Sequence, residues 1–196
     1  MVSYAVPGSD DYEGGLGLEG RLRLWLGPKV GLGLSLGLSS WDFNSQQVES
    51  RELFVVTHLS AAGNISLIPI GGSLLLRPID DGDISLTLEA GFRYVVVNSD
   101  IELNVRAADV FGNRQNVADT VDIEDGIVGV LGATLEKKLG PEVSLLIGIG
   151  YQFDVREGTV EFNGVELGDN ELKALQIGIG LAISMGPEPA TRAISQ

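Results

Sequence analysis

Several features common in soluble enzymes and in helical membrane proteins are missing from this 196-residue chain. It contains no cysteine, which excludes disulfide bonds, thiolate metal sites and a thiol nucleophile. It has no run of about 18 uninterrupted apolar residues, so no segment is a candidate transmembrane helix. Aromatic residues make up only 6% of the chain, and histidine occurs once. Basic residues form no patch, so nucleic acid is not an expected partner.

What the chain does contain is alternation. In several long runs Leu, Ile and Val hold every second position, while Gly, Ser and a few charged residues hold the others; the clearest are residues 16–26, 30–38, 143–155 and 175–185. Period-two alternation predicts β-strands, whose successive side chains point to opposite faces. Glycine on a solvated strand face costs about 0.5–1 kcal/mol, but it suits the crowded interior of a narrow barrel. The pattern therefore predicts aliphatic side chains facing lipid and small ones facing a lumen.

The spacing of these runs predicts eight strands, over residues 2–6, 15–26, 29–43, 53–77, 84–98, 126–139, 142–156 and 172–185. Short connections at 27–28, 78–83 and 140–141 alternate with long polar ones at 7–14, 44–52, 99–125 and 157–171. This alternation is typical of outer-membrane barrels, which have tight periplasmic turns and long extracellular loops. We therefore predict an all-β, eight-stranded antiparallel up-and-down transmembrane β-barrel over residues 1–186, followed by a disordered or periplasmic tail at 187–196.

Three details of this assignment stay open at this point. The segment 53–77 is long enough to be either one bulged strand or an extra hairpin turning at 61–64, and Pro69 should interrupt its ladder because proline has no N–H. Within 99–125, the alternating run 101–105 can extend the barrel above the membrane. Within 157–171, Asn-Gly at 163–164 between alternating residues predicts a hairpin.

Charge is concentrated in the long connections. They hold seventeen of the 27 acidic residues and only three of the 13 basic ones, which accounts for the whole net charge of −14. A soluble acidic protein normally spreads its charge, so this concentration predicts a molecule with two different ends.

Four segments carry a resemblance to a known group: residues 65–78, 88–94, 147–153 and 178–181. By their pattern the chain resembles the small outer-membrane β-barrel proteins of Gram-negative bacteria, the group that contains outer membrane proteins A, W and X. The resemblance implies a location in the bacterial outer membrane, with a signal peptide absent or already removed, and contact with outer-membrane lipid and lipopolysaccharide. The chain departs from the group at its last strand, which ends near Met185 without a terminal aromatic residue.

Charged and polar residues on the lumen-facing parity are the first candidate site. We predict that they form a paired network filling the lumen, because an unpaired buried charge is costly. The alternative is a narrow polar path for ions or a small solute. The candidates are Glu19, Arg21, Arg23, Glu89, Arg93, Gln152, Asp154 and Arg156.

The lipid-facing parity supplies the candidate interfacial aromatics Phe92, Tyr94, Tyr151 and Phe153. His58 and Ser60 lie on one strand face and resemble the His-x-Ser pair of outer-membrane lipid A deacylases. Ala61 departs from that family's pattern, and no acidic partner can be placed, so we interpret the two as a polar pair near the rim. We predict no catalytic residue, cofactor or metal site.

Taken together, these features predict a non-enzymatic outer-membrane barrel with a side-chain-filled lumen. We expect it to act as a structural, adhesion or complex-assembly component, with a possible protein partner at loops 99–125 and 157–171. One alternative is a narrow channel or a transporter of a small apolar solute. The other is a soluble, lipocalin-like lipid-binding barrel, whose aliphatic face would point inward.

Overall fold

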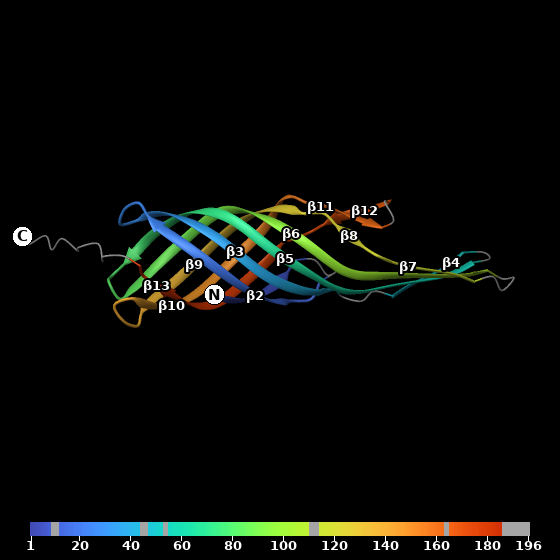
Figure 1. Ribbon diagram of the computed structural model, residues 1–196, viewed down its shortest axis with the longest axis horizontal. Helices are drawn as coiled ribbons and strands as arrows, with labels where there is room; N and C mark the ends of the chain where they lie inside the picture. Colours follow the sequence, from blue (N-terminus) through green and yellow to red (C-terminus); the bar gives the residue numbers. More distant parts are fainter. Residues whose placement is uncertain (9–11, 44–46, 53–54, 110–113, 163–164, 186–196) are drawn as a thin grey trace, which may run out of the picture.

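A closed ring of strands forms the body of the molecule (Figure 1). The computed structural model describes residues 1–8, 12–43, 47–52, 55–109, 114–162 and 165–185. Each strand of the ring pairs antiparallel with the next, and the first pairs with the last. Within the described residues eight strands make up this ring, as the sequence predicted: β1 (Val2–Pro7), β2 (Gly15–Trp25), β3 (Val30–Phe43), β5 (Val55–Asp80), β6 (Ile84–Asp109), β9 (Gly126–Lys138), β10 (Val143–Arg156) and β13 (Ala174–Ile183).

Strands β5 and β6 are much longer than the others, with 26 residues each. They pair from Val55 opposite Asp109 down to Asp80 opposite Ser85, without a break between 61 and 64. Residues 55–77 of the segment 53–77 therefore belong to one strand, and the alternative of an extra hairpin turning at 61–64 is wrong; residues 53–54 lie outside the described residues. The predicted end of the next strand at residue 98 is also wrong, because the run 101–105 continues β6 above the barrel.

The outer halves of β5 and β6 carry two further strands. Strand β4 (Gln47–Glu52) pairs with β5, and β7 (Arg114–Thr120) pairs with β6. The resulting four-stranded sheet, here called the projection, extends beyond one end of the barrel (Figure 1). The long connections 44–52 and 99–125 thus contain strands where loops were expected, because each folds back along the outer half of β5 or β6.

A second, smaller sheet lies at the same end. It contains β8 (Asp122–Ile123), β11 (Gly158–Phe162) and β12 (Val165–Asn170), with β11 in the middle. Phe162 pairs with Val165, so β11 and β12 form the hairpin predicted at 163–164. Residues 163–164 themselves lie outside the described residues.

Pro69 interrupts one ladder of the barrel wall, as predicted. Strand β3 pairs with β5 at Leu36 opposite Ile70 and at Ser39 opposite Leu67, with no pair between them. On its other side β5 pairs with β6 continuously through Pro69. The missing N–H of proline explains the one-sided interruption.

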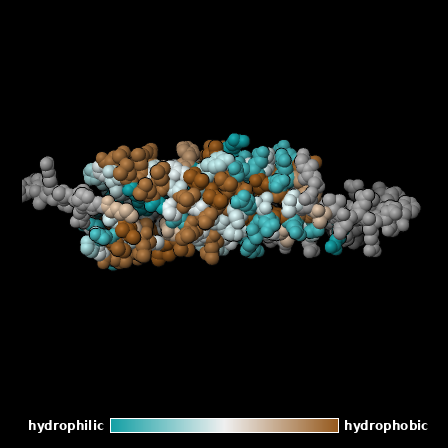
Figure 2. Space-filling model, in the orientation of Figure 1, coloured by the Kyte–Doolittle hydropathy of each residue, from teal (hydrophilic) through white to brown (hydrophobic). Residues whose placement is uncertain are grey.

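The outer surface of the ring is an aliphatic belt (Figure 2). Its side chains are largely exposed, at 67% for Leu22 and 65% for Leu181, and they come from all eight strands of the ring. The aliphatic face therefore points outward, which contradicts the lipocalin-like alternative.

Among the described residues no helix is long and apolar enough to cross a membrane. The expected tail, residues 187–196, lies outside the described residues.

Candidate functional site

Four charged side chains from two strands meet inside the barrel. Arg21 of β2 contacts Glu19 through two hydrogen bonds, Nε to Oε1 at 2.8 Å and Nη2 to Oε2 at 2.9 Å. Its Nη1 donates to Oε2 of Glu89 on β6 at 2.7 Å. Arg93 Nη2 donates to Glu19 Oε1 at 2.9 Å and lies 4.0 Å from Glu89 Oε1. We call Glu19, Arg21, Glu89 and Arg93 the lumen cluster.

Closer to the short turns, a further ion pair and a cation–π contact also occupy the lumen. Arg23 Nη1 lies 3.5 Å from Glu136 Oε2. The guanidinium of Arg77 lies 3.9 Å from the centre of the Trp25 ring, a cation–π arrangement. The sequence analysis did not name Glu136 or Arg77 as candidates. Both lie on the lumen-facing side of their strands, so continuing the alternation along β9 and β5 would have identified them.

Little space remains around the lumen cluster. The cavity there has a volume of about 20 Å³, and Glu19, Arg21, Glu89 and Arg93 are among its lining residues. A single water needs about 10–15 Å³ by the same measure, so the cavity holds little more than one water.

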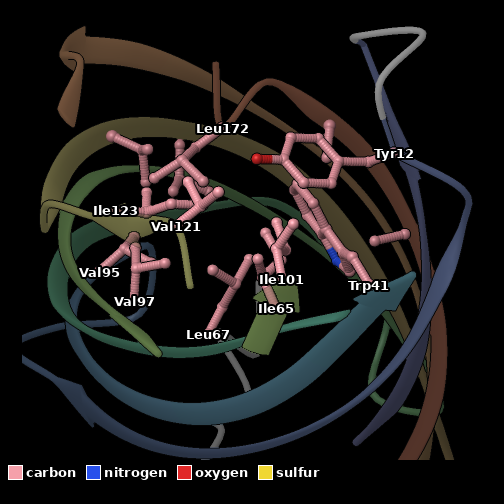
Figure 3. Packing of buried hydrophobic residues seen from close by; sticks show 14 of the residues in the cluster. Tyr12, Trp41, Ile65, Leu67, Val95, Val97, Ile101, Val121, Ile123 and Leu172 are labelled. Atoms are coloured by element: carbon pink, nitrogen blue, oxygen red, sulfur yellow. The ribbon is translucent and has the colours of Figure 1, made fainter. Parts of the chain in front are cut away.

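Above the lumen cluster the interior becomes apolar, which the sequence reasoning did not foresee. Figure 3 shows these side chains pointing toward one another within the ring. Trp41 is 0% exposed and meets the ring of Tyr12 edge-on, with ring centres 6.0 Å apart. We call this group the apolar cap; it comprises Ala5, Tyr12, Trp41, Ile65, Leu67, Val95, Val97, Ile101, Leu103, Val121, Ile123, Val128, Val130, Leu172 and Ala174.

Two of the predicted lumen residues hold the connection before β13 over the barrel mouth. Gln152 donates from Nε2 to the carbonyl of Leu172, and the Leu172 N–H donates to Asp154 Oδ1 at 2.9 Å. Leu172 thereby packs into the apolar cap. Arg156 belongs to neither the lumen cluster nor the apolar cap. The register shifts after Asp154, and the Arg156 side chain is exposed.

The four candidate interfacial aromatics gather on one side of the barrel. Phe92 of β6 and Phe153 of β10 both lie opposite Gly129 of β9, in the ladders on its two sides. Tyr151 stacks on Phe153 with ring centres 6.5 Å apart, and the Tyr94 hydroxyl donates to Asp125 Oδ2 at 2.6 Å. Phe92, Tyr94 and Tyr151 are exposed on the exterior, so the four form a patch on β6 and β10 flanking β9.

His58 and Ser60 lie on the part of β5 that belongs to the projection. In the ladders His58 is opposite Glu49 and Arg106, and Ser60 is opposite Gln47 and Asn104. The His58 side chain lies outside the described residues. Among the side chains that the structure describes, no three His, Asp or Glu residues could hold a metal ion together.

One ion pair lies at the barrel rim, outside the spanning segments. Lys173 Nζ is 3.4 Å from Glu171 Oε1, and this hydrogen-bonded carboxylate raises the pKa of the amine.

No protein-family model and no curated protein matches the sequence. Several solved structures have a similar fold. One is Ail, the attachment invasion locus protein of Yersinia pestis, in complex with the heparin analogue sucrose octasulfate. It is 12% identical in sequence, the match covers 93% of this chain and 91% of that one, and the TM-score is 0.44. Neisserial surface protein A is similar at 13% identity, 94% and 96% coverage and a TM-score of 0.41. A major outer membrane protein from Thermus thermophilus is similar at 15% identity, 93% and 99% coverage and a TM-score of 0.47. The eight-stranded ring established by the strand pairings is the fold implied by the resemblance to small outer-membrane β-barrel proteins.

Proposed function

We propose that this chain is a non-enzymatic protein of the bacterial outer membrane, in which the barrel is a closed membrane anchor and the projection is the part that meets partners. The observation that carries the proposal is the combination of an aliphatic exterior with an interior blocked at two levels. Structural, adhesion and complex-assembly roles all suit such a molecule.

The aliphatic belt supports membrane insertion. Soluble monomers rarely expose contiguous apolar patches beyond a few hundred Å², whereas this belt comes from all eight strands of the ring. A lipid-facing band of this kind, with small and charged residues inside, is typical of outer-membrane barrels. Outer-membrane lipid and lipopolysaccharide are therefore the molecules that the belt contacts.

The interior argues against the channel alternative. The lumen cluster leaves a cavity of about 20 Å³, and the apolar cap lies above it. An ion would have to displace paired charges and then cross an apolar layer. A side-chain-filled lumen is also the usual state of an eight-stranded barrel.

The projection supplies a surface for a partner outside the cell. Strands β4 and β7 are the two outermost strands of the projection, so each has one side that no other described strand covers. Exposed strand edges accept additional strands from other chains. The acidic residues of the long connections favour a partner with a cationic surface, unlike the polyanionic heparin analogue bound by Ail.

The experiment is refolding of the purified chain into phospholipid vesicles, followed by alkaline extraction and limited trypsin digestion. We expect a heat-modifiable β-rich species that stays in the membrane fraction and is cleaved within the projection at Arg106. The barrel residues Arg21 and Arg93 should resist cleavage, which makes them the internal control. A folded monomer in detergent-free buffer would contradict the proposal.

A further inference from the structure

The projection has two unlike faces, which the pairing of its four strands defines. One row of paired residues contains only apolar residues, in the order Val48, Leu59, Val105 and Val117, and we call it the apolar row. The next row lies on the other face and is polar; it consists of Glu49, His58, Arg106 and Asn116. Leu103 lies on the same strand face as Val105 and is buried in the apolar cap. The apolar row thus continues the interior face of the barrel out to the edge of the projection (Figure 1).

The open side of β7 offers backbone groups of one parity. Val121 donates its N–H to the Ile101 carbonyl at 2.9 Å, so odd-numbered residues of this segment bond toward β6. The backbone N–H and C=O groups of Arg114, Asn116 and Ala118 therefore point to the other side of β7. No described strand pairs with β7 on that side. A strand added at this edge must consequently present backbone groups of matching parity.

This parity makes the edge complementary to a second copy of itself. In an antiparallel pair of two β7 strands, residues with open backbone groups are opposite one another, which also keeps like faces of the two sheets together. The register that pairs the whole of β7 sets no like charges opposite each other; its central pairs are Val117 with Val117, Asn116 with Ala118 and Gln115 with Asp119. In this register the apolar rows of the two copies join into one.

Strand β4, the other edge of the projection, lacks this complementarity. The two registers of matching parity that pair most of β4 with itself place either Glu49 opposite Glu49 or Glu52 opposite Val48. A β7 strand paired with β4 of a second copy continues the apolar row only with Arg114 opposite Arg51. Like charges directly opposite each other destabilise a pair of strands. The β7 edge is therefore the one suited to pairing between copies.

We propose that β7 pairs antiparallel with β7 of a second copy anchored in a facing membrane. Antiparallel pairing reverses the second projection, so the two barrels lie at opposite ends of the joined sheet. Parallel pairing would leave both barrels in one membrane, but it sets the apolar row of one copy beside the polar row of the other. The partner is thus the same protein on a second cell, and the contact is homotypic adhesion. This inference takes the membrane location from the proposed function.

The lengths of the strands set the distance between the two membranes. Val95 opposite Gly126 is the last pair of β6 with β9, at the rim of the ring. From Val95 to Val105, which is opposite Val117, an extended chain spans about 33 Å. Two such runs, tilted as barrel strands usually are, place the facing rims about 50–65 Å apart.

The charge of β7 differs from that of the long connections as a whole. Strand β7 carries one basic and one acidic residue, Arg114 and Asp119, so the pairing edge itself is neutral. The acidic ends of two copies repel at longer range, and salt screens this repulsion with a Debye length of about 8 Å at physiological ionic strength. Pairing between copies should therefore strengthen as salt is added, whereas binding of a cationic partner should weaken.

Cysteine trapping tests the register, because the chain has no native cysteine. Val117→Cys places two thiols in a non-hydrogen-bonded pair with Cα atoms about 4.5 Å apart, a distance that a disulfide can bridge. Gln115→Cys is the matched control, since the same register keeps its two copies about 13 Å apart along the strands. Each variant is refolded into two vesicle populations, one carrying a tagged chain, and the populations are mixed under mild oxidation. Alkaline extraction checks insertion.

For Val117→Cys we expect disulfide-linked dimers of tagged with untagged chain, about tenfold more abundant than for Gln115→Cys. Vesicles with the native chain should be tethered in high salt, with facing membranes about 50–65 Å apart in electron cryomicroscopy. Ala118→Pro removes an N–H from the open edge and none from the ladder with β6, so it should abolish tethering.

The other outcomes separate this inference from the proposed function. Inserted native chains that leave the vesicles apart at every salt concentration would overturn the homotypic contact and leave the membrane location standing. Dimers confined to one vesicle population, or tethering without the Val117→Cys dimer, would overturn it as well. A chain that does not insert would overturn the proposed function and this inference together.

Discussion

Arg93 of β6 donates a 2.9 Å hydrogen bond to Glu19 of β2 across the interior of the barrel. Strands β3 and β5 separate the two in the ring, so the contact joins parts of the wall that do not pair. Both side chains are almost fully withdrawn from solvent, at 3% and 8% exposure. Ion pairs of this kind are costly to break because the remaining charge stays buried.

Removing one partner of the lumen cluster should therefore destabilise the barrel. Arg93→Met leaves Glu19 with Arg21 alone, and we expect the free energy of unfolding in detergent to fall by about 3–5 kcal/mol. The double variant Arg93→Met with Glu19→Gln should recover part of the loss. Lys137→Met on the exposed surface is the matched control, and urea titration is the measurement. A loss for Arg93→Met no larger than the control's would show that the cluster does not stabilise the fold.

The apolar cap makes a separate prediction. Trp41 is fully buried in it, so Trp41→Ala should leave a large cavity and cost about 3–5 kcal/mol. The exposed Asn98→Ala variant should change stability by less than about 0.5 kcal/mol. If both variants unfolded at the same urea concentration, the cap would not be a packed core.

Two exterior glycines form a matched pair. A Cβ on Gly129 would lie 2.3 Å from Cζ of Phe153, which covers this glycine, whereas a Cβ on Gly20 would meet only Leu36 O at 3.8 Å. Gly129→Ala should displace the ring and lower stability by about 1 kcal/mol. Gly20→Ala should be neutral or stabilising by about 0.5–1 kcal/mol, since glycine weakens strands. Equal effects in thermal unfolding would rule out a packing role for Phe153 over Gly129.

The rim connection offers a local test. Asp154→Ala removes the acceptor of the Leu172 N–H, so the Leu172 amide should exchange about tenfold faster with little change in global stability. Asp154→Asn keeps a side-chain oxygen and should exchange nearly as the native protein does. Unchanged exchange in the Ala variant would mean that Gln152 alone holds this connection.

The sequence predicted the eight strands, the interruption at Pro69 and the hairpin at 163–164 because each depends on local pattern. It did not predict the projection, because Asp100 and Glu102 make the outer half of β6 read as a loop until its pairing with β5 is known. Counting by parity named Glu19, Arg21, Glu89 and Arg93, which meet inside the barrel, but it left out Glu136 and Arg77 and it included Arg156, which is exposed. Contacts such as Glu19 with Arg93 depend on how distant strands are staggered around the ring, which alternation does not encode.

The closed lumen is the central claim, and planar-bilayer conductance of the refolded chain tests it most directly. The paired lumen cluster and the apolar cap lie in series, so we predict stable insertion with no unitary current. Removing one of the two cations of the lumen cluster with Arg21→Ala should not open a path while the apolar cap remains. Reproducible unitary currents in the native chain, changed in size by Arg21→Ala, would contradict the account and make the protein a channel.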